Sequence, residues 1–210
     1  MEKKGTKKII LDEALSLFAI NGYDGVTVSD IADAVGIKAA SLYKHYKSKQ
    51  DIFDSILEET AKRYNEMADK LGINGTISEK DVAQYSTMGI NTLTQAGTAL
   101  FLYFLHDDYA HKLRRMLTIE QYRNPMASKL YTQQYIDAPI AYQSAIFSIF
   151  MEQGLMRNMD AKIAATHFYT PIFLMLCLCD NCSERESEAL ELIRQHIEQF
   201  TKLYMLEEKV

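Results

Sequence analysis

Apolar residues recur at intervals of three and four along most of the chain, which is the spacing of one face of an α-helix. The first such segment carries them at Ile9, Ile10, Ala14, Leu17, Phe18 and Ile20. Asn21-Gly22 follows directly, and glycine after an apolar periodic run favours the end of a helix. The pattern therefore predicts a helix over residues 6–21.

Two shorter helices are predicted after it. Thr27 can cap a helix over residues 28–35, with Asp30 at the third helical position in a near capping-box arrangement. Gly36 suits a left-handed turn, and a further short helix is expected over residues 39–46. Two short helices about a tight turn predict a helix-turn-helix, whose second helix enters the major groove of DNA with its N-terminal residues on base edges.

The start of that second helix carries residue types that suit DNA. The methyl groups of Ala39 and Ala40 can touch a thymine methyl, the Ser41 hydroxyl can bond a base or a phosphate, and Lys38 can reach a phosphate or a guanine edge. Donors for the flanking phosphates are expected from Tyr43, Lys44, His45 and Lys49. The alternative is a surface helix with solvated charges, and spacing alone does not exclude it.

Residues 27–53, TVSDIADAVGIKAASLYKHYKSKQDIF, resemble the N-terminal domain of the tetracycline-repressor (TetR) family. The resemblance covers residues 7 to about 57 and includes the turn at Gly36 and the Leu42-Tyr43 pair. It implies an N-terminal domain that binds DNA, with contacts at or near Thr27, Lys38, Ala39, Ala40, Ser41, Tyr43, His45 and Lys49. The second helix lacks Arg or Gln at its first positions, which gives more weight to methyl contacts and DNA shape.

Helical spacing continues after residue 47. It predicts a connecting helix over 48–71, then helices over 79–105, 107–122, 125–156 with a break at Asp137-Ala-Pro139, 160–179 and 184–206. The expected fold class is all-α: a three-helix helix-turn-helix domain at 1–47 and a larger helical domain for effector binding and dimerisation at 48–210. Because the connecting helix follows the reading helices without a flexible linker, its tilt would move them as a lever.

The last two predicted helices carry more apolar surface than one packing side needs. The resemblance implies that they pair with their copies in a four-helix bundle, so that a two-fold dimer reads a palindromic operator. The alternative is that the helix over 160–179 is the buried central helix of a monomer. The candidate dimerisation residues are Phe168, Ile172, Met175, Leu190, Ile193, Ile197 and Phe200.

The middle helices are rich in aromatic residues and methionine. A pocket lined by such side chains suits an apolar, aromatic or cationic small molecule, because ring faces attract cations and thioethers adapt their shape. Core packing is the alternative reading of each of these residues. The candidate ligand-binding residues are Phe101, Phe104, Tyr122, Tyr135, Tyr142, Phe147, Met151 and Phe168.

Composition adds limits to this picture. Hydrophobic residues make up 48% of the 210 positions and charged residues 24%, which is typical of a globular protein. The net charge of −5 is uneven: residues 1–50 hold eight Lys and Arg against six Asp and Glu, giving +2, and the remaining 160 residues hold 15 against 22, giving −7. A mildly basic head favours contact with a polyanion.

Targeting signals and disulfides are not expected. The first residues lack an apolar signal core, and the longest apolar stretch, Phe168–Cys179, spans about twelve residues, short of the roughly 18 that cross a bilayer. The chain is therefore expected to be cytoplasmic, with no membrane partner. Its three cysteines, Cys177, Cys179 and Cys182, are an odd cluster without a disulfide framework, and they can be redox-active thiols or buried small hydrophobes.

The sequence offers little support for a catalytic or metal-binding site. Asp107 and His111 lie four apart on one helical face, but two ligands do not make a metal site. No nucleophile elbow or H-E-x-x-H motif is present. The chain is therefore expected to have no enzymatic activity, no metal and no cofactor.

These expectations combine into one function. The chain is predicted to be a ligand-responsive transcriptional repressor that binds double-stranded operator DNA as a homodimer and is released by a small-molecule effector. The alternative keeps the fold and acts as an activator, or through a protein partner without a small-molecule effector.

Overall fold

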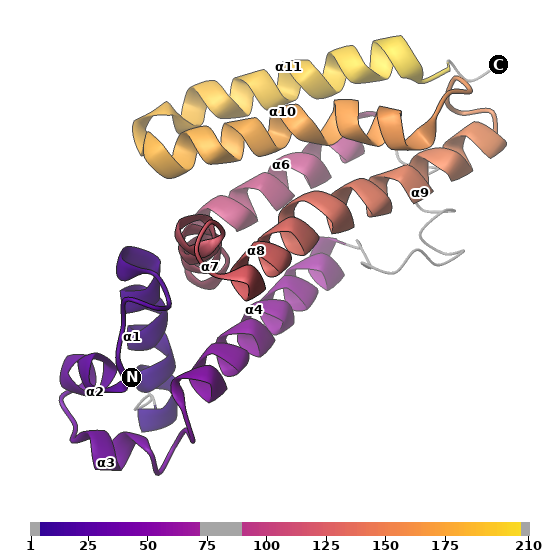
Figure 1. The fold of residues 1–210 in the computed structure, drawn as a ribbon. Helices are drawn as coiled ribbons and strands as arrows, with labels where there is room; N and C mark the ends of the chain where they lie inside the picture. Colours follow the sequence, from indigo (N-terminus) through magenta and orange to yellow (C-terminus); the bar gives the residue numbers. More distant parts are fainter. Residues whose placement is uncertain (1–4, 72–89, 207–210) are drawn as a thin grey trace. The chain divides into compact units, whose positions relative to one another are not determined.

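The computed structural model describes residues 5–71 and 90–206. Within these ranges every regular element is a helix (Figure 1). The one β-type pairing in them is an isolated bridge between Met156 and Met205. The all-α prediction is confirmed for the described residues. The first part of the helix predicted over 79–105 lies outside them.

The N-terminal part contains α1 (Thr6–Asn21), α2 (Val28–Val35), α3 (Ala39–Leu42) and α4 (Lys49–Leu71). The limits of α1 and α2 are those predicted from the sequence. At α2 the Thr27 hydroxyl accepts the Asp30 amide while the Asp30 carboxylate accepts the Thr27 amide, which is the expected capping box. Gly36 ends α2 in the left-handed conformation with φ 76° and ψ 31°.

Helix α3 is shorter than predicted. It ends at Leu42, and residues 43–45 continue as hydrogen-bonded turns in which the His45 amide donates to the Leu42 carbonyl at 2.8 Å. Leu42 is fully buried and anchors this segment in the core. Helix α3 therefore ends at Leu42, the one large apolar residue that it contains.

The remaining helices are α6 (Ile90–His106), α7 (Asp108–Glu120), α8 (Pro125–Thr132), α9 (Ala138–Glu152), α10 (Ala161–Asn181) and α11 (Glu186–Tyr204). The break predicted at 137–139 is instead a π-helical stretch, Gln133–Asp137, that joins α8 to α9 without interrupting the helix. Pro139 has no N–H to donate to the Tyr135 carbonyl four residues before it, and the Tyr169 hydroxyl of α10 donates to that carbonyl at 2.8 Å.

The chain forms two compact units. Unit 1 comprises Met1–Tyr64 and Asp107–Tyr131, and unit 2 comprises Asn65–His106 and Thr132–Val210. The division predicted at residue 47 therefore falls inside unit 1. Helix α7, which the sequence placed in the second domain, packs with the helix-turn-helix.

Helix α1 lies at the centre of unit 1, where Ile10, Leu15 and Phe18 are fully buried. It packs against α2 and α7. Helices α1 and α7 run in the same direction, because Lys8 meets Tyr109 near their starts and Gly22 meets Glu120 near their ends. The surface that α3 presents is thus held by a core that includes α7.

Unit 2 contains two apolar clusters. The first joins Phe147 and Phe150 of α9 to Ala164 of α10 and Phe200 of α11. The second joins Phe101 of α6 to residues of α10 and α11, and Phe168 packs against both clusters.

We predict that Gly22→Ala destabilises the protein by about 3 kcal/mol. Gly22 has φ 77° and ψ 167°, a region that only glycine occupies readily, and a Cβ there would overlap the Glu120 carboxylate of α7. Urea unfolding measures the change. Gly36→Ala is the control: it also has positive φ but open space around the added Cβ, so it should cost only about 1–2 kcal/mol. Equal losses would contradict the close contact with Glu120.

Candidate nucleic-acid interface

The segment from Lys38 to His45 presents one exposed, chemically mixed surface. Lys38, Ala40, Lys44 and His45 are exposed, and so is Tyr43, with 54% of its surface accessible. Among the described residues, none of the polar side chains in this group has a hydrogen-bond or ion-pair partner in the protein. Ala39 and Ser41 are half-buried beside them.

This arrangement suits a DNA duplex. Small side chains at the start of α3 allow close approach to base edges, and the Ala40 methyl and Ser41 hydroxyl offer one apolar and one polar contact. Lys38, Lys44 and His45 add donors of the kind that bind phosphate oxygens. The structure therefore brings together the predicted residues 38–45.

Thr27 caps the N-terminus of α2. Its hydroxyl donates to the Asp30 carboxylate at 2.7 Å and accepts the Asp30 amide at 3.2 Å. The Thr27 hydroxyl and the Thr27 amide both donate to the Asp30 carboxylate, which lowers the pKa of Asp30, so the capping box keeps its charge. The Thr27 side chain stays exposed, and its contact with DNA is still a prediction.

Lys49, a predicted phosphate contact, has partners within the protein. Its ammonium donates to the Tyr23 carbonyl at 2.8 Å and to the Val26 carbonyl at 2.9 Å, and it lies 4.2 Å from the centroid of the Tyr23 ring. Both carbonyls belong to the loop between α1 and α2. Because these contacts engage its ammonium, Lys49 joins the start of α4 to the loop between α1 and α2.

Tyr46 is a residue that sequence reasoning missed. It is 2% exposed, and its hydroxyl donates to the Lys7 carbonyl of α1 at 3.2 Å. Burial raises its pKa to about 12. Tyr43 and Tyr46 lie three residues apart and look alike in the sequence, so no local signal distinguishes the exposed ring from the buried one.

The predicted ligand-binding residues separate into three groups. Phe101, Phe104 and Tyr135 belong to α6 and the π-helical stretch, and the rings of Phe104 and Tyr135 meet edge to face at 6.4 Å. Four others, Tyr142, Phe147, Met151 and Phe168, pack in or against the first cluster of unit 2. Tyr122 lies in unit 1 with 88% of its surface exposed, so it is removed from the set of candidate pocket residues.

The predicted dimerisation residues lie mostly inside unit 2. Ile193, Ile197 and Phe200 are buried in its two clusters, and Phe168, Ile172, Met175 and Leu190 pack against them. Helical spacing identified the apolar face of α11 correctly, but α6, α9 and α10 cover that face within the same chain. The large apolar residues that α10 and α11 leave exposed are Ile163, Leu174, Leu192 and Leu203.

The other polar candidates have structural surroundings. The Asp107 carboxylate caps α7 and pairs with Arg63 at 2.9 Å. No group of three potential metal ligands occurs in the parts of the chain that the structure describes. Cys179 is buried, and Cys177 and Cys182 are half-buried.

Comparison with known sequences agrees with the geometry of the N-terminal region. A family model described as bacterial regulatory proteins of the tetR family matches residues 10–56. The negative transcriptional regulator IcaR of the biofilm operon icaADBC is 48% identical over 52 residues in Staphylococcus epidermidis and 52% identical over 48 residues in Staphylococcus aureus. These matches span 25% and 23% of this chain and 28% and 26% of the two relatives, so they concern about a quarter of each chain.

Solved structures extend the likeness of the fold over nearly the whole chain. A TetR-family regulator from Mesorhizobium loti has a TM-score of 0.65 at 20% identity, covering 96% of this chain and 97% of that one. The SmeT–triclosan complex has a TM-score of 0.65 at 18% identity over 98% and 94% of the two chains. PfmR from Thermus thermophilus has a TM-score of 0.61 at 24% identity over 95% and 99%.

We predict that Lys49→Ala and Lys44→Ala act on different properties. Lys49→Ala should lower the free energy of unfolding by about 1–2 kcal/mol, because two hydrogen bonds and a cation–π contact are lost, and it should leave the salt dependence of DNA affinity unchanged. Lys44→Ala should leave stability unchanged and reduce the slope of log affinity against log salt by about 0.9. Urea unfolding and fluorescence anisotropy over a salt series measure the two effects. A reduced slope for Lys49→Ala at unchanged stability would make it a phosphate contact after all.

Proposed function

Because the chain belongs, through its N-terminal domain, to the tetR family of bacterial regulatory proteins, we propose that it is a dimeric repressor of transcription that a small molecule releases from its operator. The observation that carries the proposal is the exposed surface at Lys38–His45 within a matched helix-turn-helix. The surface offers contacts to both base edges and phosphates.

Dimerisation is supported by the exposed apolar surface of α10 and α11. Ile163 and Leu174 on α10 are eleven residues apart, as are Leu192 and Leu203 on α11. Eleven residues is about three helical turns, so each pair lies on one stripe of its helix. Helix α10 has the length and hydropathy to cross a membrane, but its ends carry Lys162 and Asp180 and it packs against α6, α9 and α11. A second copy of the chain is the occupant that such a face suits.

Repression and effector release rest on the comparisons. IcaR, which is similar over about a quarter of its length, is described as a negative regulator, and this favours a repressor over an activator. The similar fold of SmeT has been determined with triclosan. In unit 2 the corresponding chemistry would come from the aromatic residues around Phe104, Tyr135, Phe147 and Phe168.

Footprinting on the DNA upstream of the chain's own gene, at two salt concentrations, tests the proposal. We predict protection of a palindrome whose half-sites lie one helical turn or a multiple of it apart, because a two-fold dimer places its two α3 segments in successive major grooves. Leu174→Arg, on the exposed stripe of α10, should convert the dimer to a 24.0 kDa monomer and weaken protection of both half-sites.

Ile20→Arg is the matched control for that substitution. Ile20 is at least as exposed as Leu174 but lies on α1 in unit 1, so sedimentation should still show a dimer. A wild-type chain that sediments only as a monomer would contradict the dimer. Binding that is weak, salt-sensitive and equal on all DNA would contradict operator recognition.

A further inference from the structure

Two adjacent lysines in the first turn of α1 hold two buried tyrosines from different parts of unit 1. The Lys7 carbonyl accepts the Tyr46 hydroxyl at 3.2 Å, and the Lys7 ammonium lies 5.1 Å from the centroid of that ring. The Lys8 ammonium donates to the Tyr109 hydroxyl at 2.8 Å and lies 4.3 Å from the centroid of its ring. Tyr46 follows α3, and Tyr109 stands at the start of α7.

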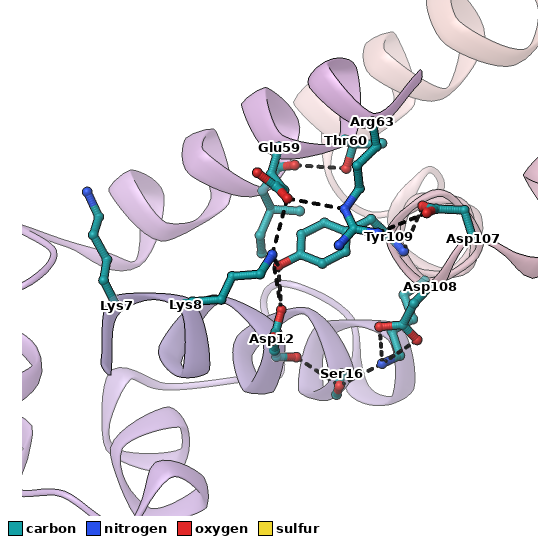
Figure 2. A network of polar contacts seen from close by, with 12 residues as sticks. Lys7, Lys8, Asp12, Ser16, Glu59, Thr60, Arg63, Asp107, Asp108 and Tyr109 are labelled. Carbon is teal, nitrogen blue, oxygen red and sulfur yellow. Dashed lines mark hydrogen bonds and ion pairs between the residues drawn. The ribbon is translucent and has the colours of Figure 1, made fainter. Parts of the chain in front are cut away.

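Tyr109 is the centre of a polar network that joins three helices (Figure 2). Its hydroxyl donates to Asp12 of α1 at 2.5 Å, and the guanidinium carbon of Arg63, on α4, lies 4.3 Å from its ring centroid. Tyr109 is 1% exposed, and burial together with the hydrogen bond to Asp12 raises its pKa. The hydroxyl therefore stays protonated and remains a donor to Asp12.

Arg63 fixes the entry into α7 as well. It pairs with Asp107 at 2.9 Å and with Glu59 at 3.2 Å. The other oxygen of Asp107 accepts the amides of Tyr109 and Ala110, which caps α7. The chain passes from unit 2 to unit 1 between His106 and Asp107. The start of α7 therefore follows α6 of unit 2 directly in the sequence.

Tyr46 fixes the opposite end of this chain of contacts. The amides of His45 and Tyr46 donate to the Leu42 carbonyl and close the turn that follows α3. The Tyr46 hydroxyl joins this turn to α1, so the position of the exposed residues Tyr43–His45 depends on the first turn of α1.

We infer that the first turn of α1 couples α7 to the exposed segment Lys38–His45, and that Tyr109 is a positioning residue for DNA binding. The effect on DNA affinity rests on the proposed function. A change at the start of α7 alters the position of Lys38–His45 by this route. The route runs from Tyr109 through Lys8 and Lys7 to Tyr46. Arg63 of α4 contacts the same tyrosine, so the helix that is expected to act as a lever also meets this route.

Hydrogen exchange on the full chain without DNA tests the coupling directly. Tyr109→Phe keeps the ring and both cation contacts but removes the hydroxyl, so we expect about fivefold faster exchange at the amides of His45 and Tyr46. The reciprocal variant Tyr46→Phe should speed exchange at the amides of Tyr109 and Ala110 by a similar factor, because coupling between two sites is mutual. Operator affinity of Tyr109→Phe should fall about fivefold at an unchanged salt slope, since no phosphate contact is removed.

Tyr122→Phe is the matched control, because it makes the same chemical change just beyond the end of α7 on a side chain that is 88% exposed. It should change none of these quantities. Faster exchange confined to α7 in Tyr109→Phe, with the amides of His45 and Tyr46 unaffected, would overturn the coupling and leave Tyr109 as a local anchor. Failure of the wild-type chain to bind an operator would instead refute the proposed function, and the exchange results would still decide the coupling.

Discussion

The packing of α1 is the constraint on which the rest of unit 1 depends. Its buried side chains meet α2, and α7 runs beside it over most of its length. Burying Ile10, Leu15 and Phe18 completely is worth about 2 kcal/mol for each side chain, so α1 cannot shift without a large loss. The exposed segment Lys38–His45 has only one fully buried side chain of its own, Leu42, and takes its position from this core.

Polar contacts then fix the position of each neighbour around α1. Lys49 holds the α1–α2 loop to the start of α4, and Tyr46 holds the end of the segment Lys38–His45 to Lys7. Tyr109 holds α7 through Asp12 and Lys8. These hydrogen bonds are partly screened from water, which makes the loss of one partner more costly than at an open surface. The exposed segment Lys38–His45 is thereby positioned by residues that lie outside it.

The sequence predicted those features whose cause is local. The limits of α1 and α2 follow from Gly22, Thr27 with Asp30, and Gly36, because a cap or a left-handed glycine acts within a few residues. The exposed candidates from Lys38 to His45 also came from local pattern and resemblance. The role of Lys49 did not, since its partners Tyr23 and Val26 lie more than twenty residues away in the sequence.

The assignments that depended on tertiary contacts were the weakest. Helical spacing gives the apolar face of α11 but does not say whether the same chain or a second copy covers it, and Ile193 and Ile197 proved to be core residues. An amphipathic pattern likewise does not say which unit a helix joins. This is why α7 was expected in the second domain although it packs on α1.

The central claim is that α7 and the helix-turn-helix form one cooperative body. Native-state hydrogen exchange of the unmodified chain under increasing denaturant tests it most directly, because helices that open together share one opening free energy. The structure predicts that the amides of Asp108–Glu120 converge with those of Thr6–Asn21 on a common opening free energy. Convergence of the α7 amides with those of α9 and α10, separately from α1, would contradict it.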